Sequence, residues 1–316
     1  MLVGTCSWSD ATLVKESDWY PRRSMTAAER LAFYANRFPV VEVESTYYFP
    51  PTPAVAASWV ERTPASFTMD VKAYSLLTGH PTLPQSLWPD LQGEVPAEHR
   101  DKRRLYAGHL PPEVLDEAWA RYLHAIGPLR SAGRLGAVLL GFPRWFGPNE
   151  VNREQIRLTA HRLGDVDGCV EFHNARWLEG SECERTLELL EETGLSFVCG
   201  DGRPGSPSTP PAVVAATSPL AVVRFHGRST GDADPGEWGA GPAWAARRFH
   251  YLYTEAELRE WVPRVHELAS SAREVHLLMN NCWRDEAVSN AADLVRILAE
   301  TGRPAPEATA RPAPGR

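Results

Sequence analysis

The chain of 316 residues predicts an α/β protein, a single domain built as a closed (β/α)8 TIM-type barrel. Short apolar runs of strand length alternate along the chain with stretches of helical period. No G-x-G-x-x-G motif follows the first run, which disfavours an open, doubly wound sheet. The strands are expected at residues 2–8, 40–47, 67–73, 135–142, 168–173, 195–201, 221–226 and 274–280.

Helix signals separate these strands. Three pairs have the spacing of a capping box, in which each side chain bonds the other residue's amide: Thr26 with Glu29, Ser181 with Glu184, and Thr254 with Glu257. Thr52 before Pro53 predicts an N-cap with proline at the first helical position. Asp285 is expected to cap the last helix, and Gly194 and Gly302 stand where C-terminal glycines belong.

Long connections follow three of the strands, so in a barrel they stand over the catalytic mouth: 74–111, 202–210 and 227–248. Within the first, residues 79–111 are rich in proline and polar residues, and we expect a mobile lid. A stabilising strap packed elsewhere is the alternative. The barrel domain is expected over residues 1–302, and the Pro/Ala-rich stretch 303–316 is expected to be a disordered tail.

Composition excludes several classes of function. The formal charge is −7 and the isoelectric point is near 5.8, so nucleic-acid binding is not expected. No apolar run approaches the ~18 residues that span a membrane. The five cysteines are scattered without a CxxC pair, and "MLVGTCSW" lacks a basic leader, so we expect a cytoplasmic protein. The oligomeric state is not predicted.

Polar residues alternate with apolar ones in the predicted strands. Successive side chains of a strand point to opposite faces, and the outer face of a barrel meets the helices. In "AVVRFH", the apolar Val223 and Phe225 therefore point outward, which leaves Arg224 and His226 inside. The same assignment sends further polar residues inward: Glu42, Glu44, Asp70, Lys72, Glu171, His173, Asp201, His276 and Asn280.

The members of this set near the carboxyl ends of strands predict a functional site, because barrel enzymes keep their sites at that end. A paired ionic core that fixes strand register is the structural alternative. Aromatic residues gather at the same end, where they form either loop packing or a stacking wall for a sugar or base ring: Trp8, Tyr47, Tyr48, Trp145, Trp177 and Trp283.

Carboxylates and imidazoles in one mouth favour acid/base chemistry, as hydrolases and isomerases use it. The expected catalytic residues are Glu171, His226, Glu44 and Asp201. The expected substrate-binding residues are Lys72, Arg224, His173, Asn280, Trp8, Tyr47, Trp177 and Trp283. A divalent metal is an alternative that the sequence does not favour, since no HxH or HExxH spacing occurs, and no cofactor is predicted. Cys6 and Cys282 are expected to approach each other as inert buried thiols.

Eight stretches together carry a family likeness: "VGTCSW", "VVEVESTYY", "FTMDVKA", "GFPRWF", "VEFHNARWL", "VVRFHGR", "YLYTEAELREW" and "LLMNNCWRDEAVSNA". In this order they resemble the YecE-like family, also called domain of unknown function 72, from residue 2 to about residue 299. The resemblance implies a TIM-type barrel of bacterial origin and supplies no reaction.

The chain departs from that family's pattern at three positions in the predicted mouth. His173 stands where the family usually has Arg, Gly141 where Gln is common, and Glu44 where Asp or Asn is usual. A ligand shared by the family need not be shared here.

The leading hypothesis is an enzyme using acid/base chemistry on a small polar or anionic, sugar-like substrate. Metal-dependent cleavage of phosphodiesters, by analogy with barrel endonucleases, is the first alternative. A non-catalytic metabolite-binding protein is the second.

Overall fold

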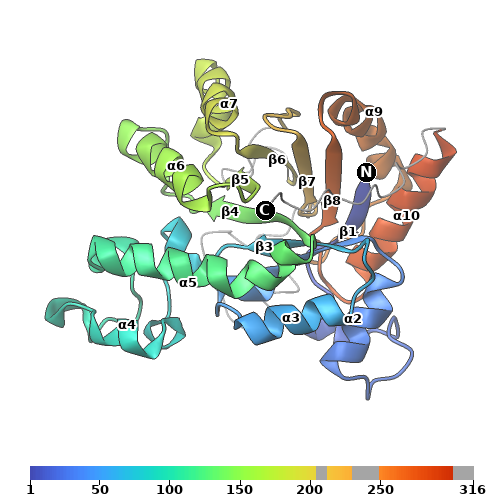
Figure 1. Cartoon of the computed structure of the whole chain (residues 1–316). Helices are drawn as coiled ribbons and strands as arrows, with labels where there is room; N and C mark the ends of the chain where they lie inside the picture. The colour runs from blue at the N-terminus through green and yellow to red at the C-terminus, as the bar shows by residue number, and fades with distance from the viewer. Residues whose placement is uncertain (204–211, 230–248, 302–316) are drawn as a thin grey trace.

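A computed structural model describes residues 1–203, 212–229 and 249–301, and these form the predicted barrel (Figure 1). Eight parallel strands close into a ring in chain order. They are β1 (Leu2–Thr5), β2 (Val40–Val43), β3 (Thr68–Lys72), β4 (Leu135–Phe142), β5 (Gly168–Phe172), β6 (Ser196–Asp201), β7 (Leu220–Phe225) and β8 (Glu274–Met279). Gly4 lies opposite Leu278 and Thr5 opposite Met279, so the first and last strands pair as expected.

Helices surround the strands (Figure 1). They are α1 (Ala11–Glu16), α2 (Ala27–Ala35), α3 (Pro53–Glu61), α4 (Pro89–Gly93), α5 (Pro112–Ser131), α6 (Glu150–Leu163), α7 (Ser181–Thr193), α9 (Glu255–Ser271) and α10 (Glu286–Glu300). Short 3-10 turns are η1 (Glu44–Tyr47), η2 (Ser75–Thr78), η3 (Pro84–Ser86), η4 (Ala97–His99), η5 (Ala107–His109) and η6 (Ala175–Leu178). The predicted second strand therefore ends early, at Val43, where the chain turns into η1.

Most of the predicted helix ends are confirmed. Thr26 and Thr254 form capping boxes, and the Thr52 hydroxyl accepts a hydrogen bond from the Val55 amide. The prediction at Ser181 is wrong, because Gly180 with φ 54° is the N-cap and the serine is already inside α7. Asp285 occupies the N-cap of α10, but its side chain makes no capping hydrogen bond. Gly302 lies outside the described residues.

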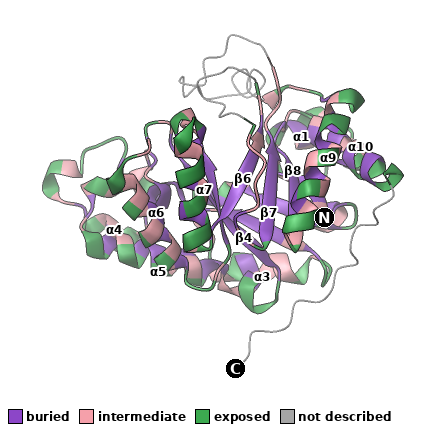
Figure 2. Ribbon diagram, turned by 90° about the horizontal axis from the view of Figure 1, so that it is seen from above, coloured by how far each residue is buried: buried purple, intermediate pink, exposed green. Residues whose placement is uncertain are grey.

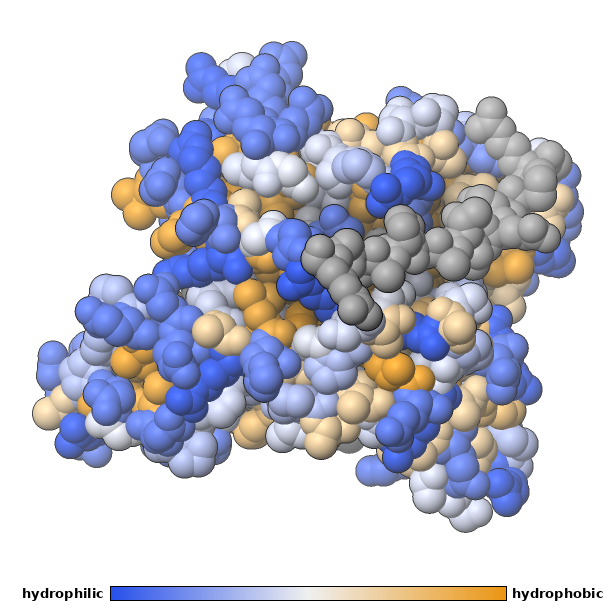
Figure 3. All heavy atoms as spheres, in the orientation of Figure 1, coloured by the Kyte–Doolittle hydropathy of each residue, from blue (hydrophilic) through white to orange (hydrophobic). Residues whose placement is uncertain are grey.

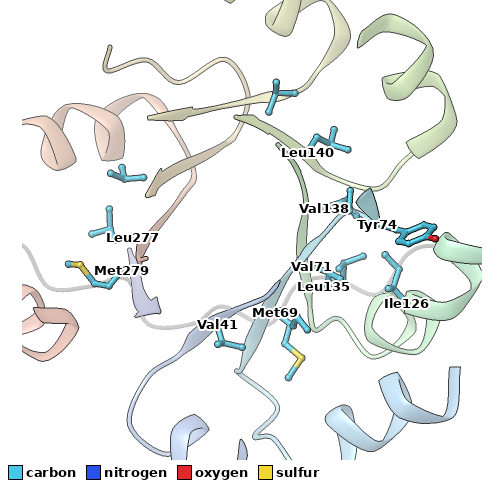
Figure 4. Packing of buried hydrophobic residues seen from close by; sticks show 14 of the residues in the cluster. Val41, Met69, Val71, Tyr74, Ile126, Leu135, Val138, Leu140, Leu277 and Met279 are labelled. Carbon is cyan, nitrogen blue, oxygen red and sulfur yellow. The ribbon is translucent and has the colours of Figure 1, made fainter. Parts of the chain in front are cut away.

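The apolar core lies mainly between the strands and the helices (Figure 4). Val138 and Leu140 on the outer face of β4 belong to this layer together with Ile126 of α5. Figure 2 shows the same division, with buried residues filling the strands and exposed residues on the outward faces of the helices. A smaller apolar cluster fills the barrel interior: Cys6, Val40, Ala137, Leu139, Cys169, Val198, Leu220, Val222 and Leu278.

An ionic group shares the interior with that cluster. His276 of β8 is fully buried, and its Nδ1 lies 2.8 Å from Oδ2 of Asp70 and its Nε2 2.9 Å from Oε1 of Glu274. Burial lowers the pKa of His276, but the two carboxylates outweigh burial and raise it to about 9. Gly136 leaves the room for this group, since a Cβ there would meet Oδ1 of Asp70 at 2.2 Å. The predicted inward direction of Asp70 and His276 is confirmed.

Residues 79–111 fold into short turns and pack against α5. Thr82 pairs with Leu105 in an isolated β-bridge, and Leu91 and Leu105 are buried. Asp90 of α4 accepts two hydrogen bonds from Arg121 of α5, and Figure 1 places α4 beyond α5 on the outside of the barrel. This packing agrees with the alternative that residues 79–111 form a stabilising strap. That the segment moves as a lid stays a prediction.

The other two long connections and the tail 303–316 lie largely or wholly outside the described residues. Among the described helices, none is long and apolar enough to cross a membrane. Hydrophilic side chains cover most of the outer surface around α6 and α7 in Figure 3.

Candidate active site at the barrel mouth

Arg224 is the centre of the predicted mouth. Its Nε and Nη2 donate to the two carboxylate oxygens of Glu42 at 2.9 and 3.0 Å, and its Nη1 donates to Oε2 of Glu171 at 2.5 Å. Only 2% of the arginine side chain is exposed. The expected contact with Glu171 is confirmed. The alternation of inward and outward residues along the strands did not identify Glu42 as the second partner.

Two glycines border Glu171 and Arg224, whose strands are separated by β6. Gly200 of β6 lies opposite Arg224 in register, so the inward position between β5 and β7 carries no side chain. A Cβ added there would have Cδ2 of His226 as its nearest atom, at 4.0 Å. On the other side, Gly141 of β4 lies opposite Glu171. The missing side chains leave the mouth around Glu171 open.

The two carboxylates on Arg224 differ in their electrostatics. Burial raises the pKa of Glu171, but the Arg224 guanidinium and the imidazoles of His226 and His173 outweigh it and hold the pKa well below its usual range. Burial also raises the pKa of Glu42, and there the nearby cations only partly offset it, so the pKa stays above its usual value. Glu171 is therefore the more acidic of the two carboxylates, and it is ionised at neutral pH.

His226 stands one step nearer the rim and is held at both ring nitrogens. Its Nε2 lies 2.7 Å from Oε1 of Glu171, and its Nδ1 lies 2.9 Å from Nδ2 of Asn280. Its side chain is 28% exposed, which confirms the expectation that solvent or a ligand reaches it. An ionised carboxylate accepts the Nε2 proton, so in the neutral ring Nδ1 accepts from the Asn280 amide.

His173, which follows β5, is the second imidazole at the same carboxylate. Its Nε2 lies 3.4 Å from Oε2 of Glu171, and its side chain is 30% exposed. A Cβ added at Gly141 would lie 3.5 Å from this Nε2, so the glycine borders the space beside it. One buried carboxylate thus supports two solvent-reachable imidazoles.

Lys72 and Glu44 form the opposite edge of the mouth. Lys72 Nζ lies 3.3 Å from Oε1 of Glu44 and 4.9 Å from the ring centroid of Tyr47. Burial lowers the pKa of Lys72, but carboxylates, Glu44 foremost, outweigh it and raise the pKa above its usual value. The lysine is therefore a paired cation.

Sequence reasoning missed His80. Its ring lies 5.3 Å from that of Tyr47 and 6.1 Å from that of Trp145, and its Nδ1 lies 3.0 Å from the Thr78 hydroxyl. Burial, with His173 and Lys72 nearby, lowers the pKa of His80 to about 3, so this ring is neutral. His80 lies after a 3-10 turn, where strand parity gives no signal.

The placement of Asp201 inside the mouth is wrong. Asp201 lies opposite the outward-pointing Phe225 in register, and its carboxylate accepts hydrogen bonds from Arg228 at 3.0–3.2 Å. Arg228 also donates to Glu260 of α9. In β6 the inward positions are those of Val198 and Gly200, so the aspartate faces the helices.

The aromatic prediction is confirmed only in part. Trp177 is fully buried, donates from Nε1 to the Phe146 carbonyl and stacks 4.7 Å from Phe172, so it cannot contact a ligand and that assignment is wrong. Trp8 is 7% exposed and packs edge-on against Trp59.

At the rim, Trp283 lies 5.9 Å from the ring of His250. Tyr48 and Trp145 are 53% and 56% exposed and can meet a ring. Tyr47 is 9% exposed between Lys72 and His80.

Burial raises the pKa of both Cys6 and Cys282, so both thiols are protonated at neutral pH. The predicted burial is confirmed for Cys6, whereas Cys282 is only half-buried. Among the described residues, no group of three or more His, Cys, Asp or Glu side chains is arranged to hold a metal ion. The described side chains of the mouth can exchange protons and form hydrogen bonds.

Comparisons with known proteins agree with this barrel. The profile of a family described as "Protein of unknown function DUF72" matches residues 2–315. The chain belongs to this family. It is 27% identical over 298 residues to the UPF0759 protein YunF of Bacillus subtilis (strain 168), covering 94% of each chain.

Two solved structures of DUF72 proteins are similar to this chain. One, from Enterococcus faecalis V583, has a TM-score of 0.73 at 24% identity, over 94% of this chain and 95% of that one. Another, from Thermotoga maritima MSB8, has a TM-score of 0.68 at 25% identity, over 94% and 99%. These two DUF72 proteins share the fold of this chain.

Proposed function

We propose that the barrel mouth binds a small polar substrate and catalyses a proton-transfer reaction of the hydrolase or isomerase type. His173 and His226 are the acid/base groups in this proposal, and Glu171 carries the negative charge that balances a proton on either ring. Lys72 and Glu44 bind polar groups of the substrate. The single observation behind the proposal is that two solvent-reachable imidazoles contact one buried, ionised carboxylate.

The arrangement suits proton transfer for physical reasons. Imidazole changes its charge near neutral pH, and a neighbouring carboxylate stabilises the charged ring. Glu171 stays ionised because Arg224 is bonded to it, and Arg224 stays in place because Glu42 bonds its other edge. The 3.4 Å contact of His173 Nε2 is the looser of the two imidazole contacts, so His173 is the group we expect to exchange a proton with the substrate.

The alternatives receive less support from the residues. Metal-dependent phosphodiester cleavage needs a ligand set, and the described residues offer no such cluster. A non-catalytic binding protein would use the same mouth, but it would not need two imidazoles on one carboxylate. Turnover is therefore the property that separates it from an enzyme.

The test is turnover across a panel of esters, glycosides, phosphate esters and aldoses, followed by proton NMR of substrate and product. We expect at least one compound to be converted, and His226→Gln and His173→Gln to lower that rate about 100-fold or more, because glutamine forms hydrogen bonds but transfers no protons. Both variants should melt within a few degrees of the parent, since both histidines are partly exposed.

His161→Gln is the matched control, because this exposed histidine of α6 lies outside the mouth. Its rate should equal that of the parent. Conversion that survives both mouth substitutions would reject the assignment of these histidines. Binding to the mouth with no conversion of any compound would favour the metabolite-binding alternative.

A further inference from the structure

The Asn280 side chain leaves one polar atom without a partner. Asn280 follows β8 directly, and its backbone amide donates to the Phe225 carbonyl at 2.8 Å. Only 7% of the residue is exposed, and its Nδ2 lies 2.9 Å from Nδ1 of His226. Its Oδ1 is buried and has no hydrogen-bond partner within the described part of the chain.

The identity of the unpartnered atom follows from the bonds around His226. Glu171 is ionised and lies 2.7 Å from Nε2 of His226, so that nitrogen carries the proton. In the neutral ring Nδ1 is then an acceptor, and the Asn280 amide must turn its Nδ2 toward it. The oxygen is the atom left facing away from the histidine.

An unpartnered buried carbonyl oxygen costs folding free energy and is uncommon in native proteins, so a native partner is expected. Asn280 lies two residues after Leu278, which belongs to the apolar cluster of the barrel interior, so the two side chains share a face and that of Asn280 points into the mouth. Gly141 and Gly200 leave room around the same floor. A ligand atom that donates a hydrogen bond satisfies this oxygen.

The charged side chains of the mouth also bear on the charge of the ligand. The Arg224 guanidinium is bonded to Glu42 and Glu171, and it is shielded from solvent. Lys72 is paired with Glu44. Within the described part of the chain, the inward-pointing cations Arg224 and Lys72 both have carboxylate partners. An anionic group on the ligand that reached these cations would therefore lie near their carboxylates as well.

We propose that Asn280 is a specificity-determining residue whose Oδ1 accepts a hydrogen bond from a hydroxyl group of an uncharged polyhydroxy ligand, a monosaccharide in chemical class. The floor of the mouth then selects the neutral sugar over the corresponding sugar acid or sugar phosphate. This inference rests on the proposed function only in using the same mouth, and it concerns binding rather than catalysis.

The test compares matched pairs of compounds by NMR titration of the isotopically labelled protein. The pairs are D-glucose with D-glucuronate, D-galactose with D-galacturonate, and D-ribose with D-ribose 5-phosphate. We expect at least one uncharged sugar to bind and its charged partner to bind at least 10-fold more weakly. Asn280→Leu should weaken the binding of the sugar at least 10-fold. Asn36→Leu should not change it, because Asn36 is exposed at the C-terminal end of α2, before β2 and at the opposite end of the barrel from the mouth.

The matched pairs are measured on the unaltered chain, so this comparison does not depend on a variant folding. Tighter binding of the charged member of a pair, binding by no sugar, or unchanged affinity in a folded Asn280→Leu variant would each overturn the inference. Neutral sugar binding without turnover would leave the inference standing and reject the catalytic proposal. Turnover of a sugar phosphate that requires His226 would support the catalytic proposal and reject the inference that the mouth selects neutral sugars.

Discussion

Replacing Arg224 with methionine tests the ionic centre of the barrel. Methionine keeps much of the apolar volume but removes the three hydrogen bonds that join the arginine to Glu42 and Glu171. Both carboxylates are almost fully buried, with side chains 0% and 5% exposed. The variant must therefore either bury two negative charges without a cation or take up protons.

Breaking a buried ion pair by removing one partner costs about 3–5 kcal/mol, because the remaining charge is left uncompensated. We expect Arg224→Met to lower the free energy of unfolding by at least this amount at pH 7. Without the guanidinium, burial raises the pKa of both glutamates in the folded variant. A group with a raised folded pKa stabilises the fold below its unfolded pKa and loses that contribution as the pH rises, so the deficit should shrink toward pH 5.

Urea unfolding followed by tryptophan fluorescence and circular dichroism measures this difference at pH 7 and pH 5. Arg162→Met is the matched control, because Arg162 also bonds a carboxylate, that of Asp116, but the Asp116 side chain is 63% exposed to solvent. Its cost should be about 1 kcal/mol with little pH dependence between these values. An Arg224→Met deficit below about 1 kcal/mol, or one that grows on acidification, would refute the ionic-centre account.

Two further predictions concern the lower interior. The folded pKa of His276, about 9, exceeds the ordinary value of 6.5, so its contribution of about 3 kcal/mol is complete below pH 6.5 and lost as the pH rises through 9. Urea unfolding between pH 6 and 10 should show this loss, and a His276→Gln variant should show much less of it. Gly136→Ala places a Cβ 2.2 Å from Oδ1 of Asp70 and 2.7 Å from Cγ2 of Thr68, so it should cost about 1–3 kcal/mol. An unchanged melting temperature would show that the site has room to relax.

Strand pattern was sufficient to predict the barrel. Each of the eight apolar runs became a strand, because a strand buried on both faces needs residues of this kind at nearly every position. The limits of the strands were less predictable. β1 stops at Thr5 and β2 at Val43 because the chain turns away at the mouth, and polar loop residues continue the alternation by chance.

The alternation of side chains along a strand predicted their direction correctly where the strand carried several apolar residues on one face. It placed Arg224 and Glu171 in one interior, and the structure shows them bonded. It failed at Asp201, which was assigned inward for its polarity although Phe197 and Cys199, at the same parity, belong to the outer core. A residue's place in the alternation decides its direction, and its chemistry does not.

The contacts of the mouth could not be predicted from the pattern. The bonds of Arg224 and His226 to Glu171 cross β6, where Gly200 has no side chain. The pairing of Arg224 with Glu42 joins β7 to β2, and the alternation along a strand does not say which strands exchange such a bond. His80 enters from the segment after β3, where no period relates sequence to direction. Trp177 looked like a rim residue because it follows a strand, but its turn folds back onto the outer core.

The nitrogen-15 NMR spectrum of the His226 side chain tests the central claim most directly, since both proposals depend on how Glu171 and Asn280 hold this ring. At a pH where the ring is neutral, the two bonds at 2.7 and 2.9 Å predict a proton on Nε2 and none on Nδ1. Asn280→Leu should shift the Nδ1 resonance more than the Nε2 resonance. A proton on Nδ1 of the neutral ring, or a ring averaging freely between both tautomers, would contradict the account.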